Sequence, residues 1–274
     1  MMEYKEILEI LEEVAEKNEN NLKMSLEKKL NEREKKVFRW LFKEYEDPSK
    51  KRWFDPHHII FSTNFALGLV EEENLDRLIV TAIILHDIGY FAIADKKNWI
   101  NSNSRIIHMQ EGTALAAKIL FEQGFNPKEV EKVVGMIAVH DNPYIGIPII
   151  GDDRLGLRDC DRAWIMHPLS FYKDLSETGR SYENPKELLL NRIVQFYSHE
   201  HPFDRSKWKV DLQELKDNGM YIEKPTYKFT KQYIEKQFNG RIMESNDRNL
   251  LSNRELFTKY LEENIINSMK EIKI

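Results

Sequence analysis

Apolar residues recur every three to four positions along most of this 274-residue chain, a spacing that places them on one face of a helix. Only 11 glycines and 9 prolines interrupt the pattern. The one strand-like run, PTYKFTKQYI at residues 225–234, is too short to change the fold class. The sequence therefore predicts an all-α protein. The stretches with helical spacing lie at about residues 4–11, 26–42, 55–70, 75–88, 107–123, 127–140, 153–164 and 185–199, followed by closing helices.

Turn and cap residues divide these stretches. Asp55-Pro56 is typical of a helix start, with the acid at the cap and the proline in the first turn. We expect Asp153 to cap a later helix. From this order we expect three segments: N-terminal helices at 1–50, a central core at 51–175, and C-terminal helices at 176–274 that pack on the core.

Composition narrows the class of protein. Hydrophobic residues make up 41% of the chain and charged residues 32%, as in a folded globular protein. The formal net charge is −5 and the isoelectric point is near 6.0, which argues against a nucleic acid polymer as partner. The N-terminus has no apolar signal core, and no apolar stretch approaches the roughly 20 residues that span a bilayer. We therefore expect a cytoplasmic protein with no membrane partner.

The short stretch LHDIGYF, residues 85–91, raises a question that packing alone does not answer. It places His86 and Asp87 side by side at the end of an apolar helix, before Gly89 stops the helix. Neighbouring residues on a helix lie about 100° apart, so two polar groups cannot share one buried face without partners. A metal ion at the helix end gives both side chains a partner at once.

Further histidines and acids lie in the same central segment. Imidazole and carboxylate donors suit Mn, Fe, Co, Ni or Zn, and the donor set does not choose among these metals. Cys160 is the only cysteine, so disulfides and a thiolate metal cluster within one chain are excluded. The candidates are His57, His58, His86, His108, His140 and His167, with Asp87, Asp141, Asp159 and Asp161.

The order of these residues is similar to a known pattern. His58, the pair His86-Asp87 and Asp161 follow one another as H…HD…D. In this order, and in the text HHIIFSTNFALGLV, IILHDIGY and LRDCDRAW, the chain resembles the HD-domain superfamily, metal-dependent phosphohydrolases with a helical core. His108 and His140 resemble the additional histidines of members that bind two metals. Over roughly residues 50–175, the resemblance implies six ligands for two divalent transition metal ions, His58, His86, Asp87, His108, His140 and Asp161, with Asp87 between the ions.

Some of these ligands have competitors. His58 shares a helix face with small and apolar residues, which favours it over His57. Asp159 lies two residues before Asp161 and so on a different face, and the resemblance favours Asp161. His108 and His140 also suit helix ends without a metal. Outside the ligand set, we expect His167, His199 and His201 at the surface.

The resemblance implies hydrolysis of a small phosphate ester or a nucleotide by metal-activated water. Asp141, next to His140, could orient ligands or act as a base. A cation should offset charge that develops on the phosphoryl group, and many HD phosphohydrolases carry it three residues after the aspartate, where this chain has Tyr90. Tyr90 could donate a hydrogen bond to phosphate, line a pocket or pack beneath the site. The candidate cations elsewhere are Lys96, Lys97, Arg105 and Arg162.

Two other functions stay open on the sequence. Mixed-valent diiron oxygenases of the same superfamily, which cleave C–C or C–P bonds, resemble this six-ligand frame and often lack the phosphohydrolase cation. A regulatory module with a metal site and no catalysis is the third hypothesis. Fold resemblance does not decide among them. The flanking helices could cover the core, close over substrate or form a homo-oligomer.

Overall fold

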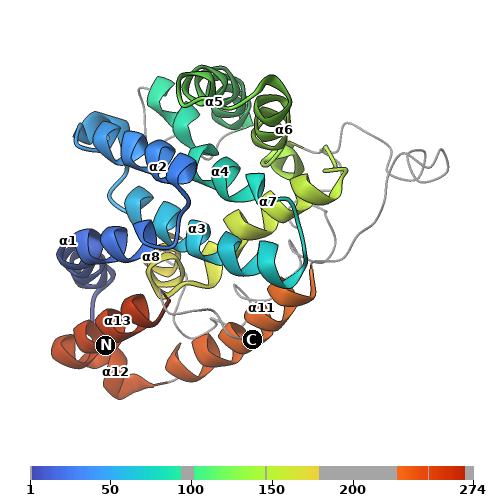
Figure 1. The fold of residues 1–274 in the computed structure, drawn as a ribbon. Coiled ribbons are helices and arrows are strands. Elements are labelled where there is room, and N and C mark those ends of the chain that lie inside the picture. Colours follow the sequence, from blue (N-terminus) through green and yellow to red (C-terminus); the bar gives the residue numbers. More distant parts are fainter. Residues whose placement is uncertain (1, 94–101, 146, 179–226, 246, 269–274) are drawn as a thin grey trace.

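The computed structural model describes residues 2–93, 102–145, 147–178, 227–245 and 247–268. Every regular element among these residues is helical, which confirms the predicted all-α class (Figure 1). The expected helix at 185–199, and with it His199 and His201, lies outside the described residues, as do Lys96 and Lys97. The α-helices are α1 (Tyr4–Glu27), α2 (Glu32–Glu44), α3 (Asp55–Glu72), α4 (Leu78–Leu85), α5 (Ser102–Glu122), α6 (Pro127–Ile137), α7 (Asp152–Ala163), α8 (Pro168–Thr178), α11 (Lys228–Ser245), α12 (Arg248–Ser252) and α13 (Arg254–Ser268). The 3₁₀ helices are η1 (Pro48–Lys50), η2 (Ile88–Ala92), η4 (Asn142–Ile145) and η5 (Trp164–Met166).

Helices α3 and α4 form the centre of the molecule (Figure 1). Every residue of α3 from Asp55 to Ala66 is buried, and so is every residue of α4 after Leu78. A helix that is buried on all sides must be enclosed by other elements. Here α1, α4 and α7 pack on α3, while α2, α6 and α7 pack on α4. The polar residues that these two helices carry are therefore held inside the protein, where they need partners.

Helices from the two ends of the chain pack on each other and on the core. α1 contacts α3, α8 and α13, and α11 contacts α3, α7 and η5. In Figure 1, α11, α12 and α13 lie along one side of the molecule, with α1 beside α13. Among the described residues, none of the helices combines the length and the apolar character that crossing a membrane requires.

The strand-like run PTYKFTKQYI, which is too short to decide the fold class, is helical from Lys228 onward, where α11 begins. Phe229 and Tyr233 lie four residues apart and so share one helix face. Both rings pack against Phe65 of α3, with centroids 5.1 Å apart in each case. The aromatic residues therefore follow a helical period that the alternation of the short run concealed.

The predicted helix starts differ from the observed ones in two places. Asp55 is the first residue of α3, and Phe54 occupies the cap position without a side-chain cap bond. Asp153 is not the cap of α7, because the helix begins one residue earlier, after Gly151 with a φ of 102°. A positive φ is accessible to glycine without steric cost, so the backbone rather than an acidic side chain starts α7.

Candidate metal centre

Four histidine rings meet in two pairs. The Nε2 atoms of His58 and His86 are 3.1 Å apart, and those of His108 and His140 are also 3.1 Å apart. His58 lies on α3, His86 follows α4, His108 lies on α5 and His140 follows α6. All four side chains are buried. The chain therefore brings together, from four separate segments, the imidazoles that the sequence predicts as ligands.

Asp87 lies between the two pairs. Its Oδ2 is 3.4 Å from Nε2 of His86 and 3.7 Å from Nε2 of His58. Its Oδ1 is 3.7 Å from Nε2 of His140 and 3.8 Å from Nε2 of His108. Each carboxylate oxygen thus serves one pair. His58 and His86 with Asp87, and His108 and His140 with Asp87, form two groups that could each hold a metal ion.

Asp161 of α7 adds a second carboxylate to the first pair. Its Oδ1 is 3.3 Å from Nε2 of His58 and 3.5 Å from Nε2 of His86. The side chains of Asp87 and Asp161 are 14% and 15% exposed, whereas the four imidazoles are almost fully enclosed. The carboxylates therefore line the side from which a small molecule would reach the cluster.

Carbonyl groups at helix ends orient the imidazoles. Nδ1 of His86 lies 2.8 Å from the carbonyl oxygen of Ile83, and Nδ1 of His140 lies 2.7 Å from that of Ile137. The last carbonyls of a helix have no partner within the helix, so they accept a hydrogen bond from the ring. With the proton on Nδ1, the lone pair of each Nε2 points into the cluster. A histidine that ends an apolar helix is thus held by the helix end itself.

The distances within the cluster fit metal coordination. Two Nε2 lone pairs 3.1 Å apart repel each other unless a proton or a metal cation lies between them. Nitrogen and oxygen donors on one transition metal, each about 2.1 Å from it, lie about 3.0–3.4 Å apart at tetrahedral to octahedral angles. The cluster distances of 3.1 to 3.8 Å are close to that range. The donor set and its spacing therefore fit divalent metal.

Charge is distributed unevenly between the two pairs. Burial opposes a charge on His86, but Asp87 and Asp161 outweigh it and raise the pKa of His86 to about 9. Burial lowers the pKa of His108 to about 4, and His140 adds to this effect. Despite burial, the surrounding imidazoles and cations hold the pKa of Asp87 and that of Asp161 well below their usual range. The first pair thus offers a more anionic environment for a cation than the second.

Gly89 allows the turn after Asp87 to lie directly on α5. A Cβ at Gly89 would lie 1.8 Å from the carbonyl oxygen of His108 and 2.6 Å from the backbone nitrogen of Gly112. No side chain fits in that space without moving the backbone. This close approach of η2 and α5 brings Asp87 within reach of His108.

The structure separates the predicted ligands from their neighbours in sequence. His57 points away from the cluster, with Nε2 2.7 Å from the carbonyl oxygen of Ala15. Asp159 accepts hydrogen bonds from Arg158 and from the backbone nitrogen of Tyr227. His58 and Asp161 therefore belong to the cluster. His57 and Asp159 instead make hydrogen bonds to other parts of the fold.

The expected surface position of His167 is wrong, since its side chain is almost fully buried. The ring stacks on Trp164 with a centroid distance of 4.7 Å, and its Nε2 lies 3.4 Å from Oγ of Ser268. Ser268 is 101 residues away and closes α13. Local sequence does not reveal a burial that depends on a distant helix.

Asp141 lies between two arginines beside the second pair. It accepts hydrogen bonds from Arg105 and from Nη2 of Arg162, the latter over 3.0 Å. Its Oδ2 is 3.7 Å from Nε2 of His108. Although burial favours the neutral acid, Arg105 and the other nearby cations lower the pKa of Asp141 to about 2. Two of the predicted cations are therefore fixed against this carboxylate.

Arg52 is a cation at the cluster that the sequence did not reveal. Its Nη2 is 3.4 Å from Oδ2 of Asp87, and its side chain is 8% exposed. Asp55 holds it through Nε and through the backbone nitrogen, each over 2.7 Å. The guanidinium covers the ring of Tyr90 at 4.6 Å. The imidazole of His108, a member of the cluster, stacks on the same ring. Arg52 lies 35 residues from Asp87, outside any motif that marks it.

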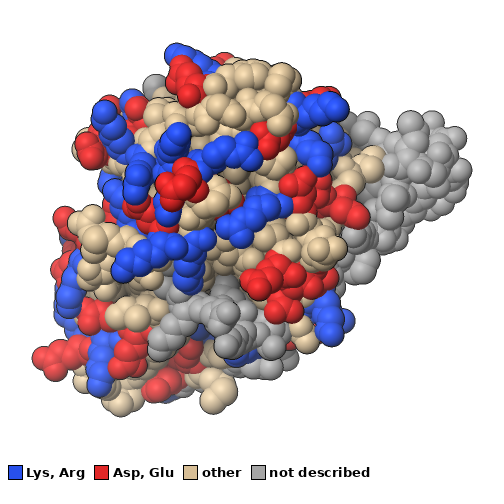
Figure 2. Space-filling model, in the orientation of Figure 1, with Lys and Arg blue, Asp and Glu red and all other residues tan. Residues whose placement is uncertain are grey.

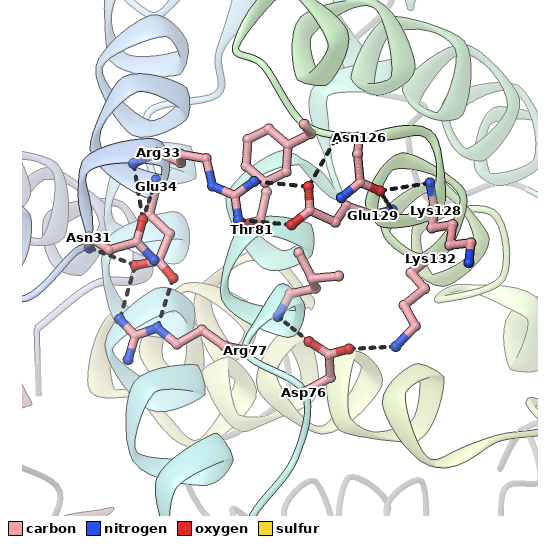
Figure 3. A pocket seen from close by; sticks show the side chains of 12 residues that line it. Asn31, Arg33, Glu34, Asp76, Arg77, Thr81, Asn126, Lys128, Glu129 and Lys132 are labelled. Atoms are coloured by element: carbon pink, nitrogen blue, oxygen red, sulfur yellow. Dashed lines mark hydrogen bonds and ion pairs between the residues drawn. The ribbon is translucent and has the colours of Figure 1, made fainter.

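A groove of about 480 Å³ lies at the starts of α2, α4 and α6 and contains no residue of the cluster (Figure 3). Asn31 and Asn126 at its rim cap α2 and α6 with their own side chains. The charged side chains across the groove are paired as Arg33 with Glu129, Arg77 with Glu34, and Lys132 with Asp76. Because these pairs already join the three helices, the groove has a structural explanation without a ligand.

Comparison with protein-family models gives one match, to the HD domain, over residues 57–194. The matched region covers half of the chain and includes all six cluster residues. The chain belongs to the HD-domain family. HD domains are helical and bind divalent metals, and their superfamily is one of metal-dependent phosphohydrolases. No curated protein and no solved structure matches the chain.

Proposed function

We propose that this HD-domain protein is a metal-dependent phosphohydrolase that acts on a small phosphate ester or a nucleotide. The position of Asp87, with one carboxylate oxygen toward each imidazole pair, is the observation that carries the proposal. Two divalent ions, when bound there, supply Lewis-acid polarisation of phosphoryl oxygens and a water that ionises near neutral pH.

On this proposal the two ion positions differ in their affinity for a divalent cation. His58, His86, Asp87 and Asp161 would hold the first ion, and Asp87, His108 and His140 would hold the second. Asp87 and Asp161 both lie within reach of the first position, whereas the second has only a share of Asp87. Asp141 lies near His108 but is paired with two arginines. The first position should therefore bind a cation more tightly. Asp87 serves both positions, so its loss should empty both.

Arg52 is our candidate for the cation that Tyr90 does not provide. A guanidinium beside Asp87 can donate hydrogen bonds to phosphoryl oxygens and offset the charge that develops on them. Its hydrogen bonds to Asp55 hold it in place before substrate arrives. On this proposal Tyr90 is a platform between Arg52 and His108 rather than a donor to phosphate.

Asp141 orients Arg105 and Arg162 rather than acting as a base. A carboxylate held by two guanidinium groups stays ionised at neutral pH and is a weak proton acceptor. Through Asp141 the two arginines are instead fixed beside the second imidazole pair. Arg162 also lies 4.0 Å from Asp161, so it adds positive charge next to the first pair as well. We propose that they help to place the anionic substrate.

The enclosure of the cluster favours a small substrate. The imidazoles are buried, and the carboxylates expose about a seventh of their side-chain surface. A single phosphoryl group can reach such a site, whereas a duplex nucleic acid would need an open basic surface. Among the described residues, cations and acids are interspersed on the face that Figure 2 presents.

A panel of phosphate esters and nucleotides, assayed with added Mn²⁺ or Co²⁺, tests the proposal. We expect phosphate release that requires metal and that Asp87→Ala abolishes in a protein that remains helical by circular dichroism. Bound iron with an O₂-dependent colour change and no phosphate release would establish the diiron oxygenase hypothesis instead. A folded protein that binds no metal and releases no phosphate would support the regulatory module.

A further inference from the structure

α5 presents an apolar stripe to solvent on the face opposite the metal cluster. Ile107 and Phe121 are 44% and 54% exposed, and Ala114 between them is also exposed. Their spacing of seven residues places all three on one side of the helix, over a length of about 21 Å. In Figure 2, uncharged side chains gather over α5 at the upper edge of the molecule. Large apolar side chains that share one exposed face are typical of an interface.

Two charged side chains of α5 lie beside the apolar stripe. Glu111 and Lys118 are exposed and also lie seven residues apart, on one flank of the apolar residues. If two copies of α5 pair about a twofold axis at Ala114, position i of one copy faces position 228 − i of the other. Ile107 then faces Phe121 of the second copy, and Ala114 meets its own equivalent, where its small side chain permits close approach.

The charges favour an antiparallel pairing. Under that twofold axis, the charged rows of the two copies lie on the same side of the contact. Glu111 then faces position 117 of the second copy, one residue from Lys118 of that copy. The symmetry creates this opposite-charge contact twice. A parallel pair would place the two rows on opposite sides of the contact, where neither charge finds its complement.

We propose that a second copy of this chain docks on α5, with the two helices antiparallel and crossing at Ala114. The contact joins apolar residues at its centre and ion pairs at its edge, which is the usual arrangement of a protein interface. A contact along about four helical turns lies at the small end of specific interfaces, so the dimer should be reversible and concentration-dependent. The cluster lies on the inner side of α5 and stays within one copy.

Sedimentation velocity over a wide range of protein concentration tests the pairing. We expect the wild-type chain to pass from monomer to dimer, and Phe121→Glu or Ile107→Glu to raise the dissociation constant by about tenfold or more. Met243→Glu is the matched control, because Met243 is 75% exposed on α11 and lies outside the stripe. A wild-type chain that stays monomeric throughout, or a dimer that Phe121→Glu does not weaken, overturns the proposal.

A charge exchange and a thiol crosslink test the antiparallel arrangement. Lys118→Glu should weaken the dimer, and Glu111→Lys with Lys118→Glu should restore it. Cys160 is buried, so Ala114→Cys introduces the one readily accessible thiol, and a short bismaleimide should link two copies through it. Met24→Cys, exposed on α1, should not be linked in this way. Failure of the double variant to recover, or no linkage at position 114, contradicts the register.

Discussion

Tyr90 lies flat on the imidazole of His108, with ring centroids 4.2 Å apart and 8° between the ring planes. The guanidinium of Arg52 covers the phenol ring at 4.6 Å. Tyr90 thus joins an imidazole of the cluster to a cation that contacts Asp87. At the position where many HD phosphohydrolases have a cation, this chain has the aromatic ring of Tyr90. That ring contacts a cation, Arg52, which comes from a different part of the sequence.

If Tyr90 acts through its ring, the hydroxyl group is not needed for turnover. We expect Tyr90→Phe to keep kcat and KM within about threefold of wild type. Tyr90→Ala should destabilise the fold by about 3–5 kcal/mol, as for truncation of other buried aromatic residues. Kinetics and chemical denaturation of both variants measure these effects. A large increase in KM for Tyr90→Phe, with unchanged stability, would show instead that the phenol binds phosphate.

Arg52→Gln should separate metal binding from turnover. We expect full metal content and a loss of about 100-fold in kcat/KM, because the variant removes a positive charge aimed at the transition state. Arg52→Lys should recover part of the rate, since it restores the charge without the planar fork of donors. Arg39→Gln is the control, because Arg39 pairs with Glu27 at the surface. Equal rates for wild type and Arg52→Gln would remove Arg52 from the mechanism.

Gly89→Ala should disturb the contact between η2 and α5. The added methyl group would collide with the backbone at His108, so we expect a destabilisation of about 1–3 kcal/mol. The second ion position should lose affinity, because Asp87 moves relative to His108. Gly135→Ala on α6 is the comparison, since its nearest neighbour beyond the helix is a side-chain atom 3.7 Å away. That variant should be neutral or stabilising by up to about 1 kcal/mol. Denaturation and metal titration of both would settle the point, and equal behaviour would refute it.

His167 should make the protein less stable in mild acid. Its Nδ1 accepts a hydrogen bond from Leu169 at the start of α8, so the ring is neutral there. Burial, with His57 and Arg241 nearby, holds the pKa of His167 well below its usual value of 6.5. Below about pH 6.5 the unfolded chain binds this proton and the folded chain does not. The free energy of unfolding therefore falls by about 1.4 kcal/mol for each pH unit below that value.

His167→Asn keeps a cap acceptor and removes the titrating group. The variant loses the stacking on Trp164, so its stability at pH 7.5 should fall. The decisive quantity is the slope of unfolding free energy against pH between about 6.5 and 5, which should be smaller by up to one proton than in wild type. Identical slopes would mean that His167 takes up its proton over the same pH range in the folded and the unfolded chain.

Local sequence predicted much of the site for physical reasons. Helical spacing placed His58 rather than His57 on the inner face of α3, and the apolar run before His86 marked a buried helix end. Both features depend on residues a few positions apart, so a single sequence displays them. The assignment of the six residues as ligands, and the division at 50 and 175, stay predictions.

Features that depend on distant segments could not be predicted in this way. Arg52 reaches Asp87 because α3 and α4 pack side by side, and nothing around Arg52 in the sequence marks that contact. The burial of His167 depends on Ser268, and the role of Gly89 depends on the backbone of α5 rather than on the turn that it seemed to provide. In each case the partner lies on an element that sequence spacing does not locate.

Metal analysis of protein purified without added metal tests the central claim most directly. We predict up to two divalent transition metal ions per chain in the wild type, about one in His140→Ala, and none in Asp87→Ala, because Asp87 serves both positions. Asp159→Ala is the matched control on α7 and should keep its metal if it folds. A wild-type chain that binds no divalent metal even after addition, or an Asp87→Ala variant with full occupancy, would contradict the account.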